Sequence, residues 1–187
     1  EKYGVLKSEV FRPQMAMLRA GKAMADSVVG DLGGKANWQV GLKSLPKLWR
    51  TDAKTIDLWA TFLVQAGGEI QARELLLHVL AKSWQPVLIR RLGLLCTTQP
   101  VATTVEQTLE LLKKHPQDTE LLLASARLLR ADNQPNEARR HLMSAGKLLQ
   151  SGPPLSEEAE ELHQLIAGEL GQLALMSASK PASLSAH

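Results

Sequence analysis

The sequence contains a single cysteine, Cys96. One cysteine cannot form an intrachain disulfide, and it does not supply the cysteine pairs of a structural zinc site. Aromatic residues make up only 4% of the chain, and Val, Ile, Tyr and Phe are scarce beside Leu and Ala. Because the scarce residues are the ones that favour strands, the composition predicts an all-α protein.

Long apolar runs are also missing. None reaches the roughly 18 residues that a membrane span needs, because charged and amide side chains interrupt the most hydrophobic region between residues 75 and 95. The chain begins at Glu1 without a signal-peptide pattern. We therefore expect a soluble piece of a longer protein, whose membrane anchor could lie upstream.

The charge is balanced, with a net value of +3. The basic side chains are dispersed and have no aromatic residues between them to stack on bases. A nucleic-acid-binding surface needs a clustered basic patch, so no nucleic-acid partner is expected.

Two stretches of the sequence are similar: "GGEIQARELLLHVLA", which begins at residue 67, and "NQPNEARRHLMSAGK", which begins at residue 133. The separation of 66 residues is two periods of about 33, the length of a helical repeat. Gly33 and Gly67, both at expected turns, lie 34 residues apart. The copies agree at three aligned pairs: Ala72 with Ala138, Arg73 with Arg139, and Leu76 with Leu142.

Apolar spacing and turn residues predict an ordered series of helices. After a lead-in at residues 1–13, a helical-repeat domain is expected over residues 14–176, and a disordered tail over 177–187. The domain comprises four helical hairpins and a capping helix with an acidic outer face, at about residues 14–50, 53–83, 86–114, 119–149 and 156–176.

Four local signals give the hairpins their ends. Asp52 and Asp118 are predicted N-caps, because their carboxylates can accept the first free backbone N–H groups of a helix. Gly67 and Gly68 are predicted to adopt positive φ at a turn. Pro46 is predicted to kink or restart the helix that carries Trp38, Leu42, Leu45 and Trp49.

Burial explains the repetition. A two-helix unit cannot cover its own apolar face, so successive units stack and share a core. Ala72 and Ala138 are small enough to let the helices of one hairpin approach closely. These features predict a right-handed α-solenoid.

The predicted hairpins resemble tetratricopeptide repeats. Ile56, Trp59-Ala60 and Leu63 match the first helix of that motif, and Ala72, Leu76 and Val79 match the second. The order of "LKSLPKLWRTDAKTIDLWATFLVQAGG", "ELLLHVLAKSWQP" and "KKHPQDTELLLASARLLRADNQPNEARRHLMSA" is similar to the C-terminal repeat region of the HemY family, over roughly residues 40–150.

The HemY resemblance implies a function and a location. Members of that family are bacterial inner-membrane proteins linked to late haem biosynthesis, so the chain is expected to be a non-catalytic scaffold for protein partners. The domain would lie at the inner membrane, on the cytoplasmic rather than the periplasmic side. Two alternatives remain open: a repeat scaffold of an envelope or exopolysaccharide-export machine, and a direct haem or porphyrin carrier.

The recurrent sequence signatures of catalysis are absent. The sequence has no Gly-rich phosphate loop, no His-Glu-x-x-His and no Gly-x-Ser-x-Gly. We expect no enzyme activity, no cofactor and no metal site. His78 and His141 are interpreted as partly buried structural histidines, and Cys96 as a small buried hydrophobe.

The expected functional site is a groove. In tetratricopeptide solenoids the first helices of the hairpins line a concave surface that receives a peptide or a partner's helix. A homodimer is a separate option, because the open end of a solenoid exposes apolar area. Two Arg beside a Leu would suit an acidic partner with an apolar anchor. By position, the groove residues are Asp57, Thr61, Val64, Arg90, Leu94, Leu123, Arg127 and Arg130.

Overall fold

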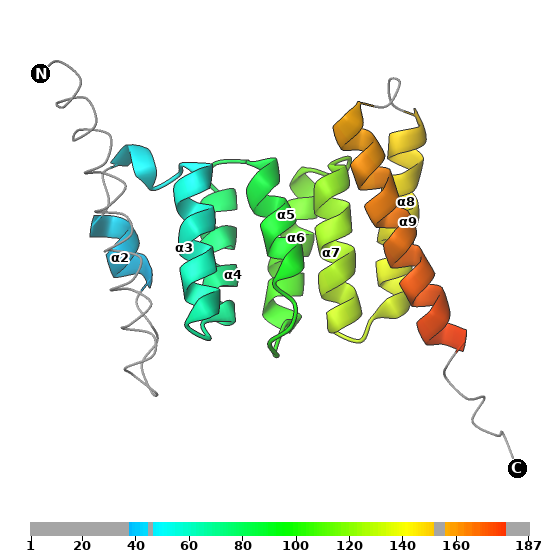
Figure 1. The fold of residues 1–187 in the computed structure, drawn as a ribbon, viewed down its shortest axis with the longest axis horizontal. Coiled ribbons are helices and arrows are strands. Elements are labelled where there is room, and N and C mark those ends of the chain that lie inside the picture. Colours follow the sequence, from blue (N-terminus) through cyan, green and yellow to red (C-terminus); the bar gives the residue numbers. More distant parts are fainter. Residues whose placement is uncertain (1–37, 45–46, 152–155, 179–187) are drawn as a thin grey trace, which may run out of the picture. The chain divides into compact units, whose positions relative to one another are not determined.

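The described part of the chain is entirely helical. The computed structural model describes residues 38–44, 47–151 and 156–178, and within these ranges it has helices but no strand (Figure 1). The all-α prediction is therefore confirmed for these residues. The predicted lead-in, the first helix of the 14–50 hairpin and the end of the chain from residue 179 lie outside the described residues.

The chain divides into two compact units, residues 1–98 and residues 99–187. The division falls inside the range predicted as the third hairpin, 86–114. Helix α5 (Pro86–Leu94) belongs to the first unit and helix α6 (Ala102–Lys114) to the second. A single repeat domain over residues 14–176 stays a prediction.

The first unit is built around α4. Helix α4 packs against α2, α3 and α5, and α3 also packs against α5. Figure 1 shows α4 behind α3. The bounds of the elements that precede α5 are α2 (Trp38–Ser44), the 3-10 helix η1 (Lys47–Trp49), α3 (Ala53–Gln65) and α4 (Glu69–Leu80).

Local chemistry fixes the ends of α3. Asp52 is its N-cap, as predicted, and its Oδ2 accepts the backbone N–H of Thr55 at 2.9 Å. Gly67 adopts φ +82° at the turn that follows, which favours glycine because it has no Cβ. The same prediction was wrong for Gly68, which has φ −93°. Gly68 is the N-cap of α4, and its negative φ is one that any residue can adopt.

The predicted apolar stripes form the core of this unit. Ile56, Trp59 and Leu63 on α3 are fully buried, as are Ala72 and Leu76 on α4. One face of each helix is therefore buried. Because α3 and α4 pack against each other and Ala72 is fully buried, a larger side chain at position 72 would have little space.

The second unit is built around α7. Helix α7 (Thr119–Ala131) packs against α8 (Pro135–Ser151) and α9 (Glu157–Ala178), α8 packs against α9, and α6 packs against α7. Asp118 is the N-cap of α7, as predicted, and accepts the N–H of Leu121 at 2.9 Å. Asn133, at the turn before α8, adopts φ +59°.

Helix α9 lies close to its predicted range of 156–176. Leu162, Ile166 and Leu173 are buried, whereas the acidic residues of its first turns are exposed. The helix continues through Ser177 to Ala178, so these two residues belong to it and not to the tail.

Candidate partner-binding surfaces

Two parallel stripes of side chains lie on neighbouring helices of the first unit. On α3 the stripe residues are spaced by four and three positions, and on α5 the spacing is the same, so each stripe occupies one helical face. Three of the six are exposed apolar residues, at 37%, 60% and 52% of their surface for Val64, Val87 and Leu94. We call this surface the α3/α5 face: Asp57, Thr61, Val64, Val87, Arg91 and Leu94.

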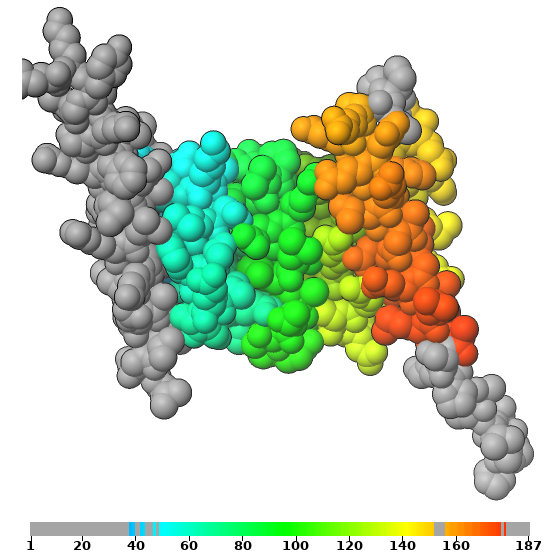
Figure 2. Space-filling model, in the orientation of Figure 1, coloured from blue at the N-terminus to red at the C-terminus, as the bar shows by residue number. Residues whose placement is uncertain are grey.

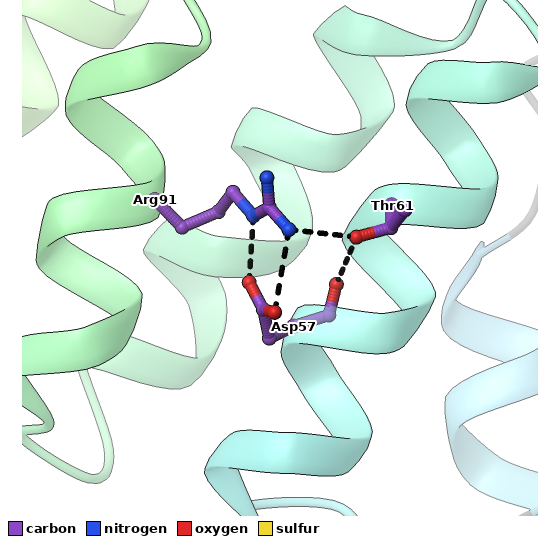
Figure 3. A network of polar contacts seen from close by, with 3 residues as sticks. All are labelled: Asp57, Thr61 and Arg91. Atoms are coloured by element: carbon purple, nitrogen blue, oxygen red, sulfur yellow. Dashed lines mark hydrogen bonds and ion pairs between the residues drawn. The ribbon is translucent and has the colours of Figure 1, made fainter.

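A polar network joins the two stripes (Figure 3). Arg91 donates from Nε to Oδ1 of Asp57 at 2.6 Å and from Nη2 to Oδ2 at 3.3 Å. The same Nη2 donates to Oγ1 of Thr61 at 2.8 Å. Thr61 in turn donates its hydroxyl proton to the backbone carbonyl of Asp57 at 2.9 Å. Both carboxylate oxygens of Asp57 are thereby bonded to Arg91.

On α5 the structure adds Arg91 to the predicted residues Arg90 and Leu94. Arg91 pairs with Asp57, which lies 34 residues earlier. The same spacing separates Gly33 from Gly67 in the sequence. Leu94 is exposed, whereas Arg90 and Arg91 are both half-buried. A role of Arg90 and Leu94 in partner binding stays a prediction.

The α3/α5 face remains accessible to a ligand. The Arg91 and Asp57 side chains are 31% and 33% exposed. An ion pair at this exposure contributes only about 0–1 kcal/mol to stability, because water screens it. A partner's carboxylate could therefore bind Arg91 at little cost, while Val64, Val87 and Leu94 offer apolar contacts.

The three predicted groove residues of the second unit have a different environment. Leu123 is only 1% exposed, so it is part of the core and the prediction that it lines a surface groove was wrong. Arg127 donates from Nε to Oε1 of Glu169 at 2.7 Å, and their side chains are 10% and 12% exposed. Arg130 binds the same carboxylate and also Oε1 of Gln172, at 2.6 Å.

The predicted partner of these two Arg was an acidic group of another protein, but in the structure Glu169 of α9 occupies that place. Arg127 and Arg130 lie on α7, and both Glu169 and Gln172 lie on α9. The pair is mostly buried, so the two Arg are held by their own chain. Their role in partner binding stays a prediction, whereas their role in joining α7 to α9 is visible.

His78 and His141 both interact within the chain. His78 is exposed, contrary to the prediction of partial burial, and packs edge-on against Trp38 with ring centroids 5.3 Å apart. Its Nε2 lies 2.8 Å from Nζ of Lys82. Because an ammonium can only donate, Nε2 is the acceptor and the ring is neutral. Although the residue as a whole is exposed, loss of water from part of the ring, and then the Lys82 charge, lower the pKa of His78.

His141 on α8 lies beside a buried serine of α7. Ser125 is 1% exposed, and its Oγ lies 2.9 Å from the carbonyl oxygen of Leu122 and 2.7 Å from Nδ1 of His141. Burial lowers the pKa of His141, consistent with a neutral structural ring.

A buried polar cluster that the sequence analysis missed ties the segment after α5 to α4. Glu69, 5% exposed, accepts the backbone N–H groups of Thr97 and Thr98 at 2.9 and 3.0 Å and both of their hydroxyls. Arg73 donates to the carbonyl of Thr98 at 2.9 Å. Burial alone would raise the pKa of Glu69, but the hydrogen bonds from Thr97 and Thr98 outweigh it and lower the pKa.

The described residues contain neither a metal-binding cluster nor a membrane-spanning helix. No group of three or more His, Cys, Asp or Glu side chains there could hold a metal ion. In the same ranges, no helix combines the length and apolarity needed to cross a bilayer. Cys96 is half-buried, where the sequence predicted a buried residue.

Comparison with known proteins adds no relative. The chain matches no protein-family model, no curated protein and no solved structure. The likeness to tetratricopeptide repeats and to the HemY family therefore rests on the sequence phrases and on the internal repetition.

Proposed function

We propose that this chain is a non-catalytic scaffold domain that binds a segment of a partner protein on the α3/α5 face. The observation that carries the proposal is the reach of Arg91 from α5 to Asp57 and Thr61 on α3. This contact brings the stripe of α3 beside the stripe of α5. The partly exposed Arg91 and Asp57 lie where the stripes meet, and exposed Val64 and Leu94 lie on the same stripes.

Two features of helix packing that occur in both units support this assignment. In each unit three successive helices pack first on second, second on third and first on third. In each unit an Arg–carboxylate pair also joins the first helix to the third: Asp57 with Arg91, and Arg127 with Glu169. Similar packing at successive places along the chain is expected of a solenoid, because each repeat in such a protein covers the apolar side of the next.

The face suits a helix or extended segment with a carboxylate between apolar anchors. Arg91 can offer two parallel N–H groups to a carboxylate, which is the geometry that Arg recognises best. Apolar residues at 64, 87 and 94 would contact side chains on either side of that carboxylate. The released Asp57 could then pair with a cation of the same partner.

The similarity of residues 40–150 to the HemY repeat region leads us to place this scaffold at the bacterial inner membrane. There it would gather proteins of late haem biosynthesis on the cytoplasmic side. Attachment to the membrane would come from a segment other than the helices described.

The function is tested by affinity capture from membrane extracts with the wild-type chain and with Leu94→Asp. Leu175→Asp is the matched control, because Leu175 is also exposed, at 72%, and lies on α9. We expect a defined partner to be captured by the wild type and the control but lost with Leu94→Asp. Equal capture by all three chains would contradict the proposal that the α3/α5 face binds the partner.

The identity of the captured proteins separates the two scaffold hypotheses. Haem-pathway enzymes support the HemY-like role, and components of a polysaccharide-export machine would replace it. A titration with haem addresses the carrier hypothesis, because axial ligation shifts the Soret band. We expect no saturable shift, and a one-to-one shift would overturn the scaffold proposal in favour of a carrier.

A further inference from the structure

A second surface, separate from the α3/α5 face, lies between α8 and α9. Its open groove has a volume of about 230 Å³. Figure 2 shows α9, in orange to red, on the viewed face, with α8, in yellow, emerging along its right-hand edge. Six of the residues that line the groove carry the argument: Met143, Gly146, Lys147, His163, Ile166 and Leu170.

The shape of this α8/α9 groove fits the side chains of a helix. Its two walls are packed helices, and the positions that line it recur at helical spacing, as with His163, Ile166 and Leu170. A third helix can lay an apolar stripe between two such walls. Small-molecule pockets usually enclose roughly 300–1,000 Å³, so 230 Å³ suits anchoring side chains better than a whole small ligand.

The floor and the rim of the groove differ in chemistry. Ile166 is 2% exposed and forms part of the floor, whereas Met143 is 50% exposed at the edge. Methionine adapts its shape to different partners and is common on helix-binding surfaces. A Cβ built at Gly146 would have no atom within 4 Å, so the groove is open above this residue and a helix could approach closely.

The charge of the lining selects the occupant. Lys147 is exposed, and none of the residues that line the groove is acidic. Arg140 lies on the same stripe of α8, one turn before Met143, and is 71% exposed, although it pairs with Glu137 at 2.8 Å. Glu137 and Glu160 both lie beyond the lining, so Lys147 supplies the charge of the groove itself.

We propose that the α8/α9 groove is a docking site for an amphipathic helix of a partner protein whose apolar stripe is flanked by acidic side chains. Its apolar residues would cover Met143 and Ile166, and a carboxylate would pair with Lys147. The site is independent of the α3/α5 face, so either can fail without the other.

The test uses the whole chain and two synthetic helical peptides of about 14 residues, or about four turns. Both carry leucines at helical spacing, flanked by Glu in one and by Lys in the other. Binding is followed by the ¹³C-methyl signal of Met143, assigned through Met143→Leu. We expect the acidic peptide to shift this signal and to bind about tenfold more tightly than the basic one.

Matched glycine variants locate the site. Gly146→Leu fills the groove, and Gly171→Leu makes the same change at an exposed position of α9 outside the lining, with no atom within 4 Å of either Cβ. We expect Gly146→Leu to weaken the acidic peptide about tenfold and Gly171→Leu to leave it unchanged. Lys147→Glu should reverse the preference between the two peptides.

Three results would overturn the proposal. The Met143 signal could stay fixed with both peptides, or the two glycine variants could behave alike. It could also shift with protein concentration alone, in which case the occupant is a second copy of this chain. Circular dichroism of each variant confirms that the helices are intact before binding is compared.

Discussion

Arg91 lies 34 residues after Asp57 and binds its carboxylate through two N–H groups, at 2.6 and 3.3 Å. The separation equals the spacing of Gly33 and Gly67 in the sequence. In the second unit Arg127 on α7 forms an ion pair with Glu169 on α9, 42 residues later. Each unit thus has an Arg–carboxylate bridge between two of its helices, accessible to solvent in the first and mostly buried in the second.

The two bridges should differ in their contribution to stability. Asp57→Ala removes a pair whose side chains are 31% and 33% exposed, so we expect a loss of at most about 1 kcal/mol. Glu169→Ala leaves the charge of Arg127, only 10% exposed, without its partner, so we expect a loss of about 3 kcal/mol.

Urea unfolding of both variants measures this difference. Glu110→Ala serves as the control, because it breaks an exposed pair with Lys113. Equal losses for Asp57→Ala and Glu169→Ala would contradict the burial argument.

Ala72 should not tolerate a larger side chain. It is fully buried where α3 and α4 approach each other, so Ala72→Phe overpacks the contact and should lower the free energy of unfolding by about 1 to 3 kcal/mol. Ala102→Phe, at an exposed position of α6, is the control. An unchanged melting temperature for Ala72→Phe would show that the space around position 72 is larger than the packing implies.

Glu69 should make stability depend on pH in the acidic range. Its pKa is lower in the folded chain than in the unfolded chain, because hydrogen bonds from Thr97 and Thr98 outweigh the effect of burial. Its contribution is therefore fully present above the unfolded value, about 4.3, and is lost as the pH falls through the folded value.

The comparison of wild type with Glu69→Gln checks this. The variant should be less stable at neutral pH, and the difference should shrink as the pH falls from about 5 towards 3. Glu106→Gln, at an exposed position of α6, should show neither effect. A difference that stays constant with pH would mean that Glu69 acts by packing alone.

His141 should also make stability depend on pH, at less acidic values than Glu69 does. Burial lowers its pKa in the folded chain, so the unfolded chain binds a proton first as the pH drops below about 6.5. Stability should therefore fall below that pH, and His141→Gln should reduce the fall. Thermal melts between about pH 7 and pH 5 measure it, and identical pH profiles for the two chains would contradict the burial of this ring.

Much of the helical framework could be predicted from the sequence. The N-caps at Asp52 and Asp118, the positive φ of Gly67 and the buried stripe with Trp59 follow from local rules of helix ends and periodicity. These features depend on residues within one or two turns of each other, so the sequence nearby contains the necessary information.

The interactions between helices were harder to predict. Arg73 and Arg139 occupy aligned positions of the repeat, yet Arg73 is 1% exposed and Arg139 is exposed. The pairing of Glu69 with Thr97 and Thr98, and of Arg127 with Glu169, depends on which long side chain can reach across a helix contact. Arg91, which joins α5 to α3, was not among the predicted groove residues, because its pairing with Asp57 likewise depends on reach across a helix contact.

The most direct test of the scaffold account is photocrosslinking in cells that express the full-length protein from its own gene. A benzophenone amino acid is placed at Leu94, at Val64 and, as a control, at the exposed Glu106 of α6. The account predicts adducts with the same partner at Leu94 and Val64 and none at Glu106. No adduct at the first two positions, or equal adducts at all three, would contradict it.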